Sequence, residues 1–136
     1  MLPKTRVIFI CTHNSSRSQM AEGLLRQLAG DRFEVYSAGT VATRVHPLAI
    51  KAMAEKGIDI SQQTSDHLDQ YMGMEFDYVI TVCDHAKEAC PYFPTNKARL
   101  HWSFPDPAAA TGTEEERLAK FREVRDQIER RLPALL

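Results

Sequence analysis

The strongest chemical signal in the chain is a cysteine and an arginine separated by five residues, Cys11 and Arg17. They bound a polar segment that follows a short apolar run and precedes apolar residues at helical spacing. In a strand–loop–helix arrangement, successive backbone N–H groups can form an anion-binding nest, and the helix N-terminus adds partial positive charge. Arg17 could donate two hydrogen bonds to a tetrahedral anion. The plainer interpretation is a polar loop with an incidental cysteine.

The positive field of such a loop would also act on the thiol. We expect it to lower the pKa of Cys11 below the ordinary value of about 8.5, which would make the thiolate a nucleophile at neutral pH. The sequence therefore predicts one loop that both holds an oxyanion and attacks it. Its predicted oxyanion-binding residues are Thr12, His13, Asn14, Ser15, Ser16, Arg17 and Ser18.

The segments around this loop indicate an α/β fold. The predicted strands are residues 7–10, 33–38, 76–82 and 99–102, and the predicted helices are 20–28, 47–57, 65–72 and a stretch that begins at Thr113. Strands that alternate with helices predict a single domain over residues 1–136 with a mainly parallel sheet. Ligands of such sheets bind at the carboxyl ends of the strands. Cys11 and Cys83 both lie at such ends, so we expect them to share one site.

Composition narrows the function classes. The chain has 136 residues and a formal net charge of -1, and no basic cluster suggests a nucleic-acid partner. Its apolar runs are far shorter than a membrane span, and its first residues lack the features of a signal peptide. Three cysteines fit free thiols in a reducing compartment better than a disulfide framework. We expect a cytoplasmic monomer.

The segment from Cys11 to Ser18 resembles the phosphate loop of the low-molecular-weight protein tyrosine phosphatase superfamily, and its continuation to Gly23 is more similar to the arsenate reductase branch. The resemblance runs from about Val7 to the final helix. It implies a four-stranded parallel sheet flanked by helices. The typical reductase loop has glycine at the position of His13 and cysteine at that of Ser16. Histidine tolerates unusual backbone angles better than most residues, which would suit the first of these positions.

Asp106 matches the general acid of the superfamily. It stands in the segment Phe-Pro-Asp-Pro, and the resemblance implies that it protonates the leaving oxygen. From the residues alone, an ordinary Pro-Asp-Pro turn is an equally good interpretation. Phosphatases of this superfamily usually carry an aromatic residue directly after the Asp-Pro pair, where this chain has Ala108. Alanine offers no platform for a tyrosine ring, so we expect a small inorganic anion.

Cys83 and Cys90 resemble the resolving pair of thioredoxin-coupled arsenate reductases. The resemblance implies that Cys11 attacks arsenate, that Cys83 attacks Cys11 and releases arsenite, and that thioredoxin reduces the final Cys83–Cys90 disulfide. Residues 84–89 form a plausible helix, which would hold the two Cα atoms about 10 Å apart. A disulfide needs about 5.5 Å, so the segment would have to unwind. Buried, inert thiols and a zinc site that also uses His85 are the alternatives.

Two further expectations complete the sequence-based prediction. Some members of the reductase branch bind potassium near the loop, and hard oxygen ligands stand here at the matching positions. Those residues are Asn14, Glu22, Ser37 and Asp66. For the whole chain, the alternatives to a reductase are a phosphatase that uses only Cys11, Arg17 and Asp106, and a non-catalytic module that senses an oxyanion or a redox state.

Overall fold

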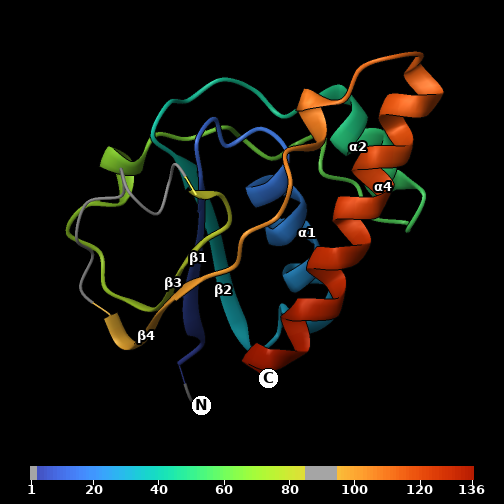
Figure 1. Cartoon of the computed structure of the whole chain (residues 1–136). Helices are drawn as coiled ribbons and strands as arrows, with labels where there is room; N and C mark the ends of the chain where they lie inside the picture. The colour runs from blue at the N-terminus through green and yellow to red at the C-terminus, as the bar shows by residue number, and fades with distance from the viewer. Residues whose placement is uncertain (1–2, 85–94) are drawn as a thin grey trace.

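The computed structural model describes residues 3–84 and 95–136, and these form one α/β domain (Figure 1). Four parallel strands make a single sheet in the order β2-β1-β3-β4. The strands are β1 (Thr5–Cys11), β2 (Phe33–Gly39), β3 (Phe76–Thr81) and β4 (Thr95–His101). The α-helices are α1 (Arg17–Ala29), α2 (Pro47–Ala54) and α4 (Glu114–Arg131). The predicted four-stranded parallel sheet is confirmed.

The central strand β1 explains why the sheet forms. Its residues Val7 to Ile10 are fully buried, because helices cover one face of the sheet and the 60–75 segment covers the other. On the helical face, α1 packs on β1 and β2 and in turn contacts α2 and α4. On the opposite face, the ring of Tyr71 makes T-shaped, edge-to-face contacts with those of Tyr36 and Phe76. A strand that is buried on both sides reads as a continuous β-branched apolar run, as this one does.

The register of the sheet determines what lies at its carboxyl edge. Cys11 is paired with Gly39 on β2, and Ile10 is paired with Thr81 on β3. Two residues after Thr81, the chain reaches Cys83. The oxyanion loop, the end of β2 and the second cysteine are therefore neighbours, as the topology predicted.

Helix ends follow local signals. Thr113 caps α4 in a complete capping box with Glu116, as predicted. His46 caps α2, and its ring Nδ1 accepts the N–H of Leu48. That helix ends at Ala54, three residues before the predicted end, and Gly57 adopts a φ of +73° in the turn that follows.

Two other predicted boundaries were wrong. Within 65–72 only a short 3-10 helix forms, Leu68–Tyr71. Strand β4 begins at Thr95 rather than 99, because a largely exposed, polar edge strand lacks an apolar signal at its start. The predicted helix at 84–89 lies outside the described residues except for Asp84. Within the described ranges, no helix combines the length and apolarity that a membrane crossing requires.

Candidate active site

The backbone of the 11–16 loop is held with all its carbonyl groups bonded. Each carbonyl accepts a hydrogen bond of 2.9–3.3 Å. The donors are the Thr40 N–H to Cys11, the Val41 N–H and Thr40 hydroxyl to Thr12, the Thr43 and Ser65 hydroxyls to His13, the Gln19 amide to Asn14, the His46 N–H to Ser15 and the Met20 N–H to Ser16. In a trans peptide the N–H points opposite to the carbonyl. The N–H groups of this loop are therefore turned to its concave side, as an anion nest requires.

Gly39 makes this arrangement possible. A Cβ atom at this position would lie 2.6 Å from the carbonyl oxygen of Thr12 and 2.8 Å from the backbone nitrogen of Asn14. Backbone atoms cannot move away as a flexible side chain can. The end of β2 thus has to be glycine for the loop to lie against it.

Asn14 provides the sharp bend of the loop. Its φ is +48°, and it is the one non-glycine residue with positive φ in the described part of the chain. The sequence suggested only that His13 would tolerate an unusual conformation, and the positive φ falls on the next residue. Asparagine tolerates the left-handed region well. Its side chain is fully buried, donates to Ser18 and Ser37 at 2.9 Å, and accepts the N–H of Asp66 at 2.8 Å.

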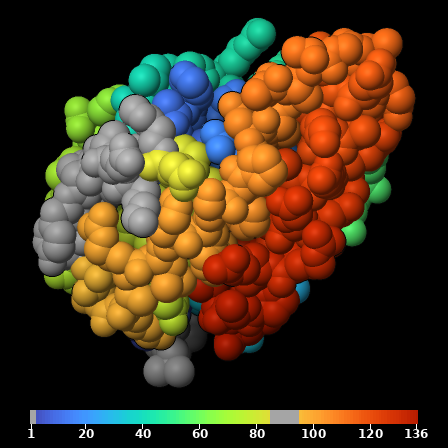
Figure 2. Space-filling model, in the orientation of Figure 1, coloured from blue at the N-terminus to red at the C-terminus, as the bar shows by residue number. Residues whose placement is uncertain are grey.

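A cavity of about 290 Å³ opens on the concave side of the loop. Its lining contains Cys11, His13, Ser15, Ser16, Arg17, Thr43, Asp106 and Ala108. Figure 2 shows the loop (blue) at the surface between the segment after β2 (teal) and the segment before α4 (orange). Three of the predicted oxyanion-binding residues, Thr12, Asn14 and Ser18, do not line it. The Asn14 and Ser18 side chains bond each other behind the loop, so only their backbone could serve an anion.

Arg17 reaches this cavity from the start of α1. Its Nη1 donates to the carbonyl oxygen of Phe104 at 3.1 Å, and its Nη2 lies 3.9 Å from Oδ2 of Asp106. Its Nε and the hydroxyl of Ser16 are buried and have no hydrogen-bond partner. Unpaired buried donors are costly, and an oxyanion in the cavity is the kind of ligand that would pair them.

Asp106 forms the turn that its sequence allowed, and it also lines the cavity. It caps the 3-10 helix Pro107–Ala109, and its Oδ1 accepts the N–H of Ala108 at 2.9 Å. Its other carboxylate oxygen faces Arg17 across the cavity that Cys11 lines. The turn therefore positions the carboxylate at the cavity rim, close to where a leaving oxygen would lie.

Cys11 and Cys83 are in contact, which supports the expectation that they share one site. Both are 3% exposed, and their thiols are hydrogen-bonded. The hydroxyl of Thr12 lies 3.3 Å from Sγ of Cys83. Cys90, the third predicted thiol, and His85 of the zinc alternative lie outside the described residues. Within the described residues, no group of three or more His, Cys, Asp or Glu side chains could hold a metal ion.

The Cys11 pKa differs from our expectation. The hydrogen bond with Cys83 and burial raise the pKa of Cys11 above its ordinary value, and they outweigh Arg17 and the Thr12 backbone, which lower it. The sequence argument counted the positive field and omitted the second thiol. Because the two thiols are hydrogen-bonded neighbours, the negative charge of either thiolate makes the other thiol harder to ionise.

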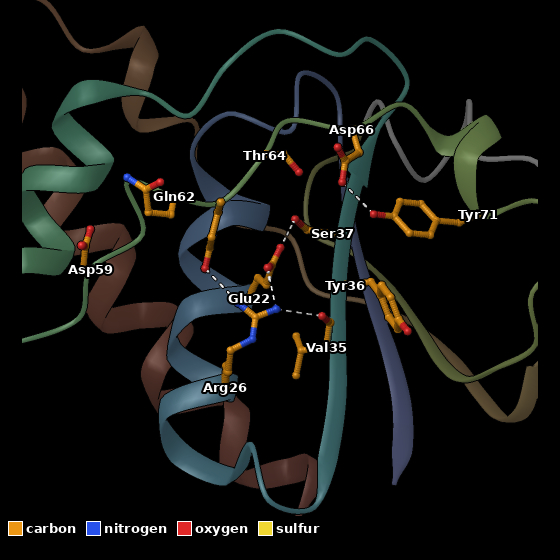
Figure 3. Close-up of a pocket in the computed structure, with 11 residues that line it drawn as sticks. Glu22, Arg26, Val35, Tyr36, Ser37, Asp59, Gln62, Thr64, Asp66 and Tyr71 are labelled. Carbon is orange, nitrogen blue, oxygen red and sulfur yellow. Dashed lines mark hydrogen bonds and ion pairs between the residues drawn. The ribbon is translucent and has the colours of Figure 1, made fainter.

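The four predicted potassium-binding residues gather behind the loop. Glu22, Ser37 and Asp66 line a second cavity, of about 460 Å³, as Figure 3 shows, whereas Asn14 does not line it. Ser37 donates to Glu22 at 2.5 Å, Tyr71 donates to Asp66 at 2.6 Å, and Asn14 bonds Ser37. Arg26 neutralises part of the charge through an ion pair of 2.7 Å with Glu22. The donors are hard oxygens, which fit a hard cation.

Several residues of the site were not found from the sequence. Gly39, Thr43, His46 and Ser65 shape the loop from other segments, and Gln19 does so from the following helix. Only Gly39 gave a signal, since a glycine at the end of a strand can mark close backbone approach.

Comparison with known proteins places these features in context. Residues 6–136 match the family described as low molecular weight phosphotyrosine protein phosphatase. An arsenate reductase of Halalkalibacterium halodurans is 54% identical over 129 residues, which are 95% of this chain and 93% of the relative. A solved arsenate reductase in the oxidized state is 38% identical with a TM-score of 0.84, over 96% of this chain and 95% of that one. A thioredoxin-dependent arsenate reductase of Corynebacterium glutamicum is 32% identical with a TM-score of 0.72, over 98% of this chain and 60% of that chain.

Proposed function

This chain belongs to the low-molecular-weight phosphotyrosine protein phosphatase family, and we propose that it reduces arsenate to arsenite through a relay of three cysteines. The observation that carries the proposal is a second thiol, Cys83, in contact with the loop nucleophile Cys11. Phosphate transfer needs one thiol, whereas a two-electron reduction needs two. The names of the curated relatives point the same way.

In the first step, Sγ of Cys11 attacks arsenic and an As–S bond forms. The bond from arsenic to one of its hydroxyl groups breaks, and the departing hydroxyl takes a proton from Asp106 and leaves as water. The N–H groups of the loop and Arg17 would hold the remaining oxygens during this change. Ala108 lines the cavity where an aromatic residue would flank a tyrosine ring, which suits a small anion.

In the second step, Sγ of Cys83 attacks Sγ of Cys11. The S–S bond forms as the As–S bond breaks, and the bonding pair stays on arsenic, which goes from As(V) to As(III) and leaves as arsenite. Two thiols are thereby oxidised to one disulfide. Thr12 can donate its hydroxyl hydrogen to the Cys83 thiolate and so favour the attacking form.

Recycling completes the cycle. Cys90 would attack Cys83 and free Cys11, and a thioredoxin-type dithiol would reduce the resulting Cys83–Cys90 disulfide. Support for this reductant is the name of the Corynebacterium glutamicum relative and the Cys-x6-Cys spacing. Such a cycle needs a reducing compartment, so we place the protein in the cytoplasm. We further propose that it acts as a monomer.

Potassium is the one cofactor that we propose. Glu22, Ser37, Asn14 and Asp66 would hold it and thereby stiffen the back of the loop. Because the ion would bind the folded state alone, the unfolding temperature should rise in KCl relative to equal NaCl, and Glu22→Gln should abolish the difference. Equal unfolding temperatures in the two salts would contradict the proposal.

The deciding experiment measures NADPH oxidation with arsenate, thioredoxin and thioredoxin reductase. Wild type should turn over steadily, Cys90→Ser should release one arsenite per chain and stop, and Cys83→Ser should release none. If Cys83→Ser keeps multiple turnover, the relay is wrong. If the wild type hydrolyses a phosphoester at full rate but reduces no arsenate, the chain is a phosphatase.

A further inference from the structure

At the bend of the oxyanion loop, the carbonyl of Asn14 is supported by a side chain and by no backbone N–H group. Asn14 adopts the left-handed conformation, with a φ of +48°. The carbonyl groups of Cys11, Thr12, Ser15 and Ser16 all accept backbone N–H groups, and that of His13 accepts two side-chain hydroxyls. Asn14 depends instead on a single side-chain amide, because its carbonyl accepts from Nε2 of Gln19 at 2.9 Å. The sharpest point of the nest therefore rests on one amide.

The side-chain amide of Gln19 is held in one orientation. It is fully buried on the first turns of α1, and its Nε2 donates its second hydrogen to the carbonyl oxygen of Thr64 at 2.8 Å. Two carbonyl acceptors require the nitrogen of the amide on that side, so its orientation is determined. Both hydrogens are used, and the amide ties the loop to the segment that carries Asp66.

Gln63 fixes the other end of the same amide. Its Nε2 donates to Oε1 of Gln19 at 2.8 Å and to the Gln19 backbone carbonyl at 3.1 Å. Its own Oε1 accepts from Arg26 at 3.2 Å. Gln63 makes no side-chain hydrogen bond to the loop within the described residues, and its most direct route to Asn14 runs through Gln19. A chain of two amides, both orientations fixed, thus leads from the protein surface to Asn14.

We propose that Gln19, held by Gln63, is a positioning residue that keeps Asn14 bent and the N–H groups of the loop aimed at the oxyanion. The inference rests on the proposed oxyanion-binding role of the loop. According to this inference, the loss of the two amides lowers anion affinity and not only the stability of the fold. Neither residue touches the cavity in which the anion would lie.

The experiment compares Gln19→Met, Gln63→Met and the double variant with Gln62→Met. Methionine keeps the length of the side chain and removes its hydrogen bonds. Gln62 is an exposed neighbour that lines the second cavity, as Gln63 does. Its side chain makes no hydrogen bond within the described part of the chain, which makes it the matched control. Calorimetry gives the dissociation constant of inorganic phosphate, and hydrogen exchange reports on the amides of residues 12–17 without any ligand.

Gln19→Met should weaken phosphate binding about tenfold and speed exchange in the loop, since a buried carbonyl loses its donor. Gln63→Met should weaken binding about threefold. Because Gln63 acts through Gln19, the double variant should bind phosphate no more weakly than Gln19→Met alone. Gln62→Met should match the wild type in both measurements.

Several results would overturn the inference. Wild-type affinity and exchange in Gln19→Met would show that the amide does not position the loop. Additive losses in the double variant would show that Gln63 acts by another route. If Gln19→Met does not fold, Gln63→Met decides the question, since its side chain lies at the half-buried end. A wild type that binds no phosphate contradicts the proposed function, while hydrogen exchange still tests the positioning role.

Discussion

The oxyanion loop and the segment around Asp106, here called the acid loop, both line one cavity, yet they are stabilised in opposite ways. The 11–16 loop is held by hydrogen bonds from several segments, and its bend is buried. Asp106 is 45% exposed, and its local support is two prolines, one bond to Ala108 and a distant arginine. A charge-binding loop works best when its dipoles are already oriented. A proton donor must recover its proton from water in every cycle, and exposure permits that.

Gly39→Ala should break the oxyanion loop most completely. The new methyl group would meet the Thr12 carbonyl and the Asn14 nitrogen, so we expect arsenate reduction to fall by about a thousandfold and stability by about 1–3 kcal/mol. Gly73→Ala is the control. It has a φ of +92° and open space around it, so it should lose stability while kcat/KM stays within about twofold. Equal activity losses in both variants would refute a local effect.

Asp106→Asn should distinguish the function of the acid loop from that of the oxyanion loop. Asparagine keeps the cap on Ala108 but cannot give up a proton, so kcat/KM for arsenate should fall by roughly 10²–10⁴-fold. Phosphate affinity should change little, because the nest is intact. A large loss of phosphate affinity, or a kcat/KM within about threefold of wild type, would mean that the carboxylate serves binding and not proton transfer.

Cys83→Ala should sharpen the electrostatic side of the comparison. The hydrogen bond with Cys83 is the largest cause that raises the pKa of Cys11, so its removal should lower that pKa and increase the thiolate fraction at neutral pH. Alkylation of Cys11 by iodoacetamide, followed by mass spectrometry across a pH series, should become about tenfold faster near pH 7. An unchanged midpoint would mean that burial alone governs the thiol.

His46 connects the two loops and should give the smallest effect. Its N–H holds the Ser15 carbonyl, its ring packs on Phe121, and burial lowers its pKa, with Arg117 and Arg44 adding to the shift and Asp106 opposing it. The unfolded chain therefore binds more protons just below the ordinary value of about 6.5. Stability is fully present above that pH and declines as pH falls through it.

Urea titrations of His46→Asn provide the check. Asparagine can cap α2 but does not titrate, so the variant should lose less free energy of unfolding than wild type between about pH 7.5 and pH 5.5. Parallel losses in the two proteins would assign the pH dependence to other groups.

Local chemistry was predictable from the sequence and distant support was not. The Cys11–Arg17 spacing between a strand and a helix predicted the loop, and parallel topology predicted that Cys83 would lie beside Cys11. The donors Thr43, His46 and Ser65 carry no pattern that points to a loop thirty to fifty residues away. The same limitation produced the error in the Cys11 pKa. The prediction placed the two thiols together but treated the charge of each one separately.

The acid loop was the easier region to predict for the same reason. The capping bond of Asp106 lies within two residues, so the Pro-Asp-Pro sequence determines most of its shape. The bend at Asn14 required contacts with residues 18, 19, 37 and 66, and no sequence pattern identified Asn14 as the site of the bend. The helix that was predicted after Cys83 and the position of Cys90 stay predictions.

The groups that donate hydrogen bonds to the carbonyls of the oxyanion loop have a consequence for the order in which the protein folds. They come from segments that span most of the first half of the chain, from Gln19 to Ser65. The loop can adopt its binding shape only after β2, the start of α2 and the 63–66 segment have all docked. Anion affinity is then the last property to appear during refolding and the first to disappear on heating, while helical content and the sheet still persist.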